Sequence, residues 1–186
     1  MVLFVGLGTA LAAPPSSLPS RPEPVLVEVM TVPDAYAELR ELLLAHHVAS
    51  LPRGVAPEEQ AGLLWLATHD ELLVVRERAL LVLGMSEPSA DAAQHCRALA
   101  SESSAGKVRA AALRCWSATP EASTPEGVEW LAAALDAPDV RVARATIDEL
   151  GRSTAGQERL ATWLETGAAA PELRARAQAA LDAQRR

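Results

Sequence analysis

Residues 75–84 read Val-Arg-Glu-Arg-Ala-Leu-Leu-Val-Leu-Gly, a stretch with the pattern V-R-x-x-A-x-x-x-L-G. Its first, fifth and ninth residues are apolar, and this spacing places them on one face of an α-helix. Versions of the pattern recur at residues 108–117, 142–151 and 173–182. Successive copies begin 33, 34 and 31 residues apart, and self-similarity at such a period is typical of repeated helical units.

Each copy of the pattern is preceded by a segment that can form a second helix. Pro57, Thr124 and Ser153 stand where a first-turn proline or an N-terminal cap is expected. Starts of the pattern helices are expected near Asp70, Ser103 or Ser104, Asp136 and Pro171. The sequence therefore predicts an all-α fold of the α-solenoid type, a superhelical stack of antiparallel helix pairs. The expected elements are a lead helix over 34–49 and the pairs 57–68 with 70–84, 88–101 with 104–118, 125–135 with 138–151, and 154–166 with 170–184.

Three details of these helices can be predicted from residue type. Gly84 and Gly151 follow the last turn of their units, where a left-handed C-cap is typical. The helix over 71–83 is apolar nearly all round, which favours an interior place in the stack. The last helix carries Arg174, Arg176 and other polar residues, which suits the end of a stack.

The strongest copy of the repeat runs from Asp136-Ala137-Pro138-Asp139-Val140-Arg141 to Leu150-Gly151. It resembles the D-x-x-V-R…A…L-G signature of HEAT-like repeats, including the short version named after phycobilisome lyases. The resemblance covers roughly residues 57–184 and concerns the fold. It implies a curved scaffold whose concave face receives a partner, with no shared catalytic residues to carry over. The third unit departs from the pattern, because its arginine is at 141 or 144 and not directly after Val142.

The first residues differ in composition from the rest of the chain. Residues 1–13 are apolar, carry no charged side chain and include Ala10-Leu11-Ala12, a small-x-small pattern typical of signal-peptide cleavage sites. A basic segment before the apolar run is missing. Residues 14–33 are rich in proline and predict an extended linker, in which 25–29 alternates enough to form a strand or lies on the first helix. We expect an exported protein, periplasmic or extracellular, or a cytoplasmic one if this segment is not a signal.

Composition narrows the classes of function. Residues of the apolar group make up 49% of the 186-residue chain and aromatic residues 3%, so the apolar content is mostly Ala, Leu and Val, which favours closely packed helices. The formal net charge is −7, which argues against nonspecific binding to nucleic acid or anionic membranes. No stretch predicts stable membrane insertion once a signal is removed.

Arginines recur at one position of the repeat. Arg76, Arg109 and Arg174 each follow the first residue of a pattern copy, and Arg141 or Arg144 approximates the third member. One interpretation is an arginine ladder on the inner face that binds an acidic partner or phosphates. The other, which we favour, is that each arginine bonds an acidic residue of its own or the next repeat, because 24 acidic residues are available.

The two cysteines of the chain fall on the two expected helices of the second pair. If that pair forms an antiparallel hairpin, Cys96 and Cys115 lie within one turn of facing each other, so a disulfide is feasible. An oxidising compartment would favour it. The alternative is two buried free thiols.

Other residues that often carry chemistry have simpler explanations here. His46 and His47 are adjacent and point about 100° apart on a helix, so they do not converge on one metal ion. The same geometry separates His95 from Cys96 as a base–nucleophile pair. The tryptophans at 65 and 163 each stand ten residues before a pattern copy, which favours packing between helices over ligand stacking. We therefore expect no metal site and no cofactor.

The sequence lacks the nucleophile elbow, the phosphate-binding loop and the zinc-protease motif. Our first hypothesis is a non-catalytic, monomeric HEAT-like scaffold that binds a protein partner. The second, drawn from the resemblance, is a lyase-type module that handles a cofactor or chromophore. It would need a reactive or cofactor-holding pocket, and a free cysteine would be its best nucleophile. The third, a nucleic-acid reader, is disfavoured by the acidic charge balance.

Overall fold

The computed structural model describes residues 33–46, 55–166 and 170–183. These residues form helices and turns without a strand, which confirms the predicted all-α class. The expected signal segment 1–13, residues 14–32 of the expected linker and the possible strand over 25–29 lie outside the described residues. None of the described helices combines the length and the hydropathy that a membrane-spanning segment requires.

In the described ranges the chain is a succession of short helices joined by tight turns. Their bounds are α1 Asp34–Ala45, α2 Pro57–His69, α3 Leu73–Gly84, α4 Ala90–Glu102, α5 Gly106–Ser117, the 3-10 helix η2 Pro120–Ser123, α6 Pro125–Ala132, α7 Val140–Leu150, α8 Thr154–Glu165 and α9 Pro171–Ala183.

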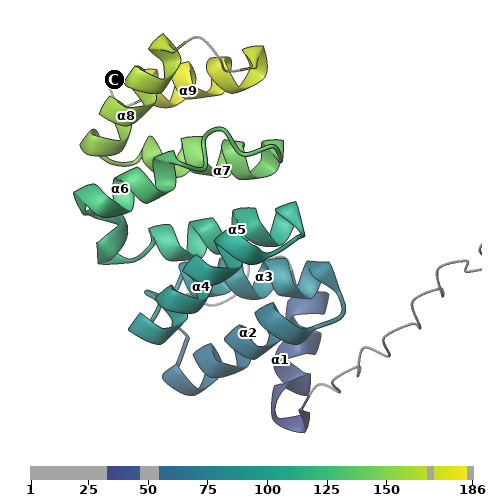
Figure 1. The fold of residues 1–186 in the computed structure, drawn as a ribbon. Helices are drawn as coiled ribbons and strands as arrows, with labels where there is room; N and C mark the ends of the chain where they lie inside the picture. Colours follow the sequence, from purple (N-terminus) through teal and green to yellow (C-terminus); the bar gives the residue numbers. More distant parts are fainter. Residues whose placement is uncertain (1–32, 47–54, 167–169, 184–186) are drawn as a thin grey trace, which may run out of the picture.

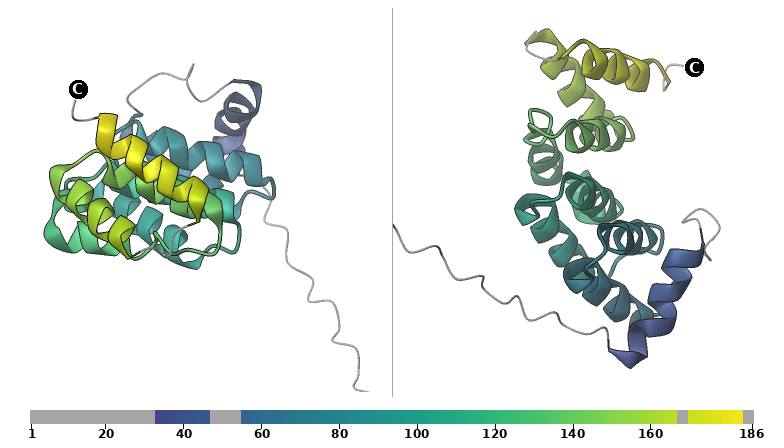
Figure 2. Two further views of the ribbon diagram at one scale, coloured as in Figure 1. Left: turned by 90° about the horizontal axis from the view of Figure 1, so that it is seen from above. Right: turned by 90° about the vertical axis from the view of Figure 1, so that its right-hand side faces the viewer.

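These helices pack in two layers (Figure 1). One layer consists of α3, α5, α7 and α9, each in contact with the next. The other consists of α2, α4, α6 and α8, each packed on the helix that follows it in sequence, with η2 between α5 and α6. The right-hand view of Figure 2 shows that the stack is bowed, with α3, α5, α7 and α9 on the concave side. We call this the inner layer and the other the outer layer.

The lead helix α1 packs on α2 and α3 and is held by a buried ion pair. The Arg40 Nε donates to Asp70 Oδ2 at 2.6 Å, and the Asp70 side chain is fully buried. This bond with Asp70 raises the pKa of the Arg40 guanidinium above its usual value. Breaking such a pair leaves a buried charge without compensation, so it ties α1 to the end of α2.

Several predicted helix starts are confirmed. The Thr124 hydroxyl accepts from the Gly127 amide at 3.1 Å and begins α6. The Ser153 hydroxyl accepts from the Gly156 amide at 3.1 Å and begins α8. Proline occupies the first position of α2, α6 and α9, where its missing amide proton costs nothing.

Other predicted boundaries were wrong by two to four residues. Helix α3 begins at Leu73 and not at residue 70, because the Asp70 carboxylate accepts from the Leu72 amide and forms a turn first. Ser103 does the same with the Ala105 amide, so α5 begins at Gly106. Asp139, rather than Asp136, caps α7 through the Arg141 amide.

Two expected helix ends also differ. The lead helix ends at Ala45, because His46 has extended backbone angles; residues 47–49 of the expected helix lie outside the described residues. Helix α6 ends at Ala132, where the hydrogen bonds of residues 134 and 135 tighten to the i−3 carbonyls.

The prediction that Gly84 and Gly151 form left-handed caps was wrong. Gly84 is the last residue of α3, and Gly151 has a right-handed φ of −60°. Close helix approach explains both glycines. A Cβ on Gly84 would lie 3.0 Å from the Cys115 Cα of α5, and one on Gly151 would lie 3.0 Å from the Ala180 Cβ of α9. The glycines let neighbouring helices of the inner layer approach closely, against backbone atoms at Gly84 and against the Ala180 side chain at Gly151.

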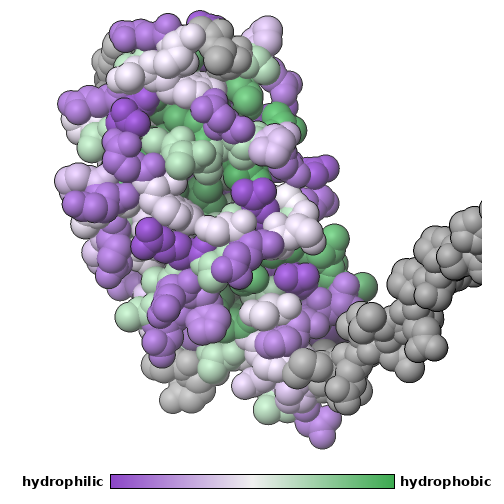
Figure 3. Space-filling model, viewed as in Figure 1, coloured by the Kyte–Doolittle hydropathy of each residue, from purple (hydrophilic) through white to green (hydrophobic). Residues whose placement is uncertain are grey.

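The prediction of an interior position for 71–83 is only partly correct. Val75, Ala79, Leu80 and Leu83 are fully buried between α2 and α5. Residue 72 and the first two residues of α3 are 39–47% exposed, so the start of this segment is not covered by the described helices. Figure 3 shows apolar surface at the right-hand edge of the molecule, where α3 begins in Figure 1.

We predict that Gly84→Ala lowers the free energy of unfolding by about 1–3 kcal/mol, because backbone atoms of Cys115 have no room to move aside. The matched control is Gly62→Ala in α2, whose added Cβ would meet the Tyr36 ring at 3.0 Å, a side chain that can rotate. The gain in helix propensity is up to about 1 kcal/mol for Gly62→Ala and smaller for Gly84→Ala, because Gly84 is the last residue of α3. Urea unfolding of the two proteins checks this; equal stability of the variants would contradict the packing argument.

Candidate binding site on the inner layer

The arginines expected to form a ladder lie on the inner helices α3, α5 and α9, and their side chains reach the C-terminal ends of the outer helices. The Arg76 Nε donates to the Ala67 carbonyl at 2.9 Å, and the Arg109 Nε donates to the Ala100 carbonyl at 3.0 Å. The Arg174 Nη1 donates to the Leu164 carbonyl at 3.3 Å. All three acceptors lie in the last turn of α2, α4 or α8, where carbonyls lack helical partners and the helix dipole favours a cation. These arginines bond backbone carbonyls, rather than the carboxylates expected from the sequence.

The remaining candidates, Arg141 and Arg144, lie elsewhere, on the exposed face of α7. They line a hollow of about 300 Å³ on the inner layer. We call this site the basic hollow and define it by its five cations: Lys107, Arg114, Arg141, Arg144 and Arg176. Glu77 and Ala110 complete its lining.

Helix geometry explains why these residues meet. Counted from the first residue of each pattern copy, Lys107 and Arg141 stand one position before it, and Arg144 stands two after it. Positions three or four residues apart share one helix face, so the hollow is lined by a stripe adjacent to the buried one. The arginines directly after the first residue do not lie on this stripe, whereas the sequence candidates Arg141 and Arg144 do. Lys107, Arg114 and Arg176 were not predicted, although Lys107 and Arg141 share one position of the pattern.

Ion pairs between helices organise one side of the hollow. The Arg176 guanidinium donates two hydrogen bonds of 2.7 Å to Asp148, which raises the pKa of Arg176 above its usual value. Arg114 lies 3.5 Å from the same carboxylate. One acidic side chain of α7 therefore joins cations of α5 and α9 and leaves this side of the hollow with excess positive charge.

The other side of the hollow is more open. Arg144 lies 3.1 Å from Glu172, and both side chains are about half exposed. Arg141 lies 3.4 Å from Asp139, and 57% of its side chain is exposed. Exposed pairs of this kind contribute roughly 0–1 kcal/mol, so a ligand can replace them. Among the described residues, Lys107 forms no ion pair within 4.0 Å.

A buried carboxylate lies on the same helix, on its packed side. The Glu149 side chain is 2% exposed, and its Oε2 accepts from the Ser117 hydroxyl at 2.7 Å and lies 2.8 Å from Arg152. Its Oε1 has no hydrogen-bond partner among the described residues. Burial raises the pKa of Glu149, while Ser117, Arg152 and Arg114 act in the opposite direction. The fold therefore carries an electrostatic cost at this position when the carboxylate is ionised.

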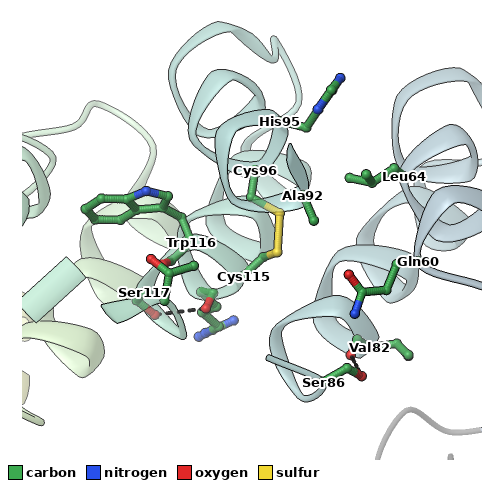
Figure 4. Close-up of a disulfide and its surroundings, with 12 residues drawn as sticks. Gln60, Leu64, Val82, Ser86, Ala92, His95, Cys96, Cys115, Trp116 and Ser117 are labelled. Carbon is green, nitrogen blue, oxygen red and sulfur yellow. Dashed lines mark hydrogen bonds between the residues drawn. A yellow bond between two sulfur atoms is a disulfide. The ribbon is translucent and has the colours of Figure 1, made fainter. Parts of the chain in front are cut away.

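The structure joins the two cysteines in a disulfide between α4 and α5. Figure 4 shows the bridge between the two helices, with Leu64 and Gln60 of α2 on one side and Trp116 on the other. Both cysteines are fully buried. The open choice between a bridge and two thiols is thus resolved in favour of the bridge.

The histidines and tryptophans lie in separate surroundings. His69 and His95 are exposed, and the Nδ1 atom of each lies within hydrogen-bond distance of a carbonyl of its own helix. His47 lies outside the described residues. Trp116 and Trp130 pack with ring centroids 4.4 Å apart beneath the Arg97 guanidinium. Within residues 33–46, 55–166 and 170–183 there is no group of three potential metal ligands.

The tryptophans that precede the pattern copies contact neighbouring elements, Trp65 the helix α1 and Trp163 the turn between α6 and α7. The Trp65 ring lies 5.8 Å from the Tyr36 ring of α1. The Trp163 indole donates to Asp136 at 3.0 Å and is 8% exposed. These contacts are the packing role expected for tryptophan on a partly apolar face.

We predict that replacing both cysteines by alanine lowers the free energy of unfolding by about 3 kcal/mol, because the bridge closes a loop with a sequence separation of 19. Urea unfolding with and without reductant provides the measurement. Reductant should destabilise the wild type by a similar amount and leave the variant unchanged. A loss below about 1 kcal/mol would contradict the loop-closure account.

We also predict that Glu149→Gln stabilises the protein relative to the wild type increasingly as pH rises from about 4 to 7. A carboxylate whose folded-state pKa is raised favours folding most below its unfolded pKa, about 4.3, and loses that contribution as pH rises through the folded pKa. Gln keeps the acceptor for Ser117 without the charge. Denaturant unfolding at several pH values gives the difference; Glu129→Gln, at a 59% exposed side chain, is the control. A difference that shrinks as pH rises would contradict the prediction.

No protein-family model, no curated protein and no solved structure matches the chain. Its function is therefore inferred from its own residues.

Proposed function

We propose that this chain is a non-catalytic HEAT-like repeat scaffold, an α-solenoid, that binds a protein partner on its inner layer. The first support is the repetition of side-chain roles. Arg76, Arg109 and Arg174 occupy the same place in three copies of the pattern, and each donates to a carbonyl at the end of the preceding helix. Such equivalence is expected when one supersecondary unit is repeated.

The second support is the arrangement of the helices. Each outer helix packs on the inner helix that follows it, and each inner helix packs on the next. Each pair contacts mainly its neighbours, which is the packing logic of a repeat protein. The resemblance noted above implies that the concave face of such a scaffold receives the partner.

The observation that carries the proposal is the basic hollow. Its lining comes from four consecutive inner helices, α3, α5, α7 and α9, through residues far apart in sequence. A surface assembled across several repeats is suited to an extended partner. The cations of the basic hollow are exposed or partly exposed on this surface. By contrast, Arg76, Arg109 and Arg174 bond backbone carbonyls.

We extend the proposal to location. The apolar segment 1–13 has the pattern of a signal peptide, and disulfides persist mainly in exported proteins. Both observations support a periplasmic or extracellular scaffold.

The alternative, a lyase-type module that handles a cofactor, has no specific observation in its favour. It would lose its best nucleophile, because the two cysteines of the chain are joined and fully buried.

Photo-crosslinking in the native host tests the scaffold proposal. A photoreactive residue at Val74 or Ala179, both exposed on the stripe that lines the hollow, should crosslink to a defined protein partner. The same residue at Gln94 or Ala161, exposed on outer helices, is the matched control and should yield little. Crosslinks confined to the outer positions, or none from either layer, would contradict the proposal.

A further inference from the structure

We propose that the basic hollow binds an acidic segment of the partner protein that also carries apolar residues. The inference rests on the proposed function and specifies the chemistry of the partner. Three observations support it: the local charge, the placement of two cations on their helices, and the exposed apolar side chains at equivalent or adjacent positions of the pattern.

The local charge opposes that of the whole chain. The chain has a net charge of −7, yet the hollow is lined by five cations and one carboxylate. Three further carboxylates, Asp139, Asp148 and Glu172, contact these cations from the rim. Asp148 is shared by two arginines, so the pairing is incomplete. Lys107, Arg141 and Arg144 remain exposed for an external anion.

Two of these cations stand where they disfavour folding. Lys107 is the second residue of α5, and Arg141 is the second residue of α7. The N-terminal turn of a helix carries partial positive charge, so cations there cost stability and anions would gain it. One carboxylate of the chain already lies at both turns: Asp139 caps α7, lies 3.4 Å from Arg141, and is the side chain that a Cβ on Gly106 of α5 would meet. A ligand carboxylate would add to this compensation, above all for Lys107, which has no acidic residue in its own first turn.

Exposed apolar side chains occupy positions of the pattern equivalent or adjacent to those of the cations. Val74 of α3 occupies the same repeat position as Lys107 and Arg141 and is 39% exposed. Val140 adjoins Arg141 and is 36% exposed, and Leu73 is 47% exposed. Cations next to exposed aliphatic groups complement a peptide that has both carboxylates and apolar side chains.

This combination favours a peptide over a nucleic acid. A polyphosphate backbone needs a continuous basic surface, and the acidic remainder of the chain repels it at physiological salt, where screening extends over about 8 Å. A short acidic segment places its charge within the hollow itself. Guanidinium groups such as Arg141 and Arg144 match carboxylate geometry with paired hydrogen bonds.

Selection from a random twelve-residue peptide library on the immobilised full-length disulfide-bonded protein tests the inference. We expect the recovered peptides to be enriched in Asp and Glu together with Leu, Ile or Val. Enrichment of basic peptides, of apolar peptides without acids, or no enrichment would overturn the proposal. Crosslinking from Val74 or Ala179 reports the proposed function separately, because it detects a partner on the inner layer whatever its charge.

Binding of a selected, fluorescently labelled peptide then locates the site. The variant Arg141→Ala/Arg144→Ala should raise the Kd about tenfold or more, since two charge-assisted contacts are lost. The matched control, Arg97→Ala/Arg159→Ala, removes the same charge from outer helices α4 and α8 and should change the Kd less than about twofold. Circular dichroism and Tm verify that both variants are folded. Equal loss in both, or stronger binding of a single-stranded 20-nucleotide DNA than of the peptide, would overturn the proposal.

Discussion

The close approach of α3 and α5 organises the centre of the molecule. Gly84 ends α3 directly over the backbone of Cys115, and the same cysteine is bonded to Cys96 of α4. Three helices are therefore joined around one residue, and α2 adds Leu64 from the opposite side (Figure 4). Small residues make this spacing feasible: Ala79, Ala111 and Ala112 are buried in the same layer. Because side chains are short here, helix positions depend on backbone contact, and few substitutions can be absorbed by repacking.

This packing divides the cations of the inner layer into two groups. An arginine directly after the first residue of a pattern copy lies beside the buried stripe. Its side chain reaches back to the last turn of the preceding outer helix, as those of Arg76 and Arg109 do. Such arginines connect the two helices in three of the pairs and are engaged with backbone carbonyls. Lys107 and Arg141, one position before the first residue of a pattern copy, lie on the neighbouring stripe and are exposed. A shift of two residues along a helix thus separates a structural cation from one open to a ligand.

Two buried carboxylates, Asp70 and Glu149, have different partners. Asp70 has the Arg40 guanidinium as a direct partner and connects the lead helix to the stack. Glu149 is buried with a hydroxyl and one exposed arginine, and one of its oxygens has no hydrogen-bond partner among the described residues. Asp148, the preceding residue, lies at the rim of the hollow and shares its charge between Arg114 and Arg176. Adjacent acidic residues of α7 therefore lie on different faces of one helix, one in the core and one at the basic surface.

The sequence by itself determined the helical class and the position of most helices, because apolar residues three and four apart and capping residues such as Thr124 and Ser153 are local signals. It also brought Cys96 and Cys115 within one turn of facing each other. Only the tertiary structure decided the role of Gly84, because the backbone that a Cβ at this position would meet belongs to Cys115, 31 residues away. The basic hollow likewise depends on how α3, α5, α7 and α9 stack, because its residues become neighbours only when separate helices pack side by side. Local sequence patterns determine which face each helix buries. The charge of the exposed surface depends on which helices pack side by side, because its cations come from different helices.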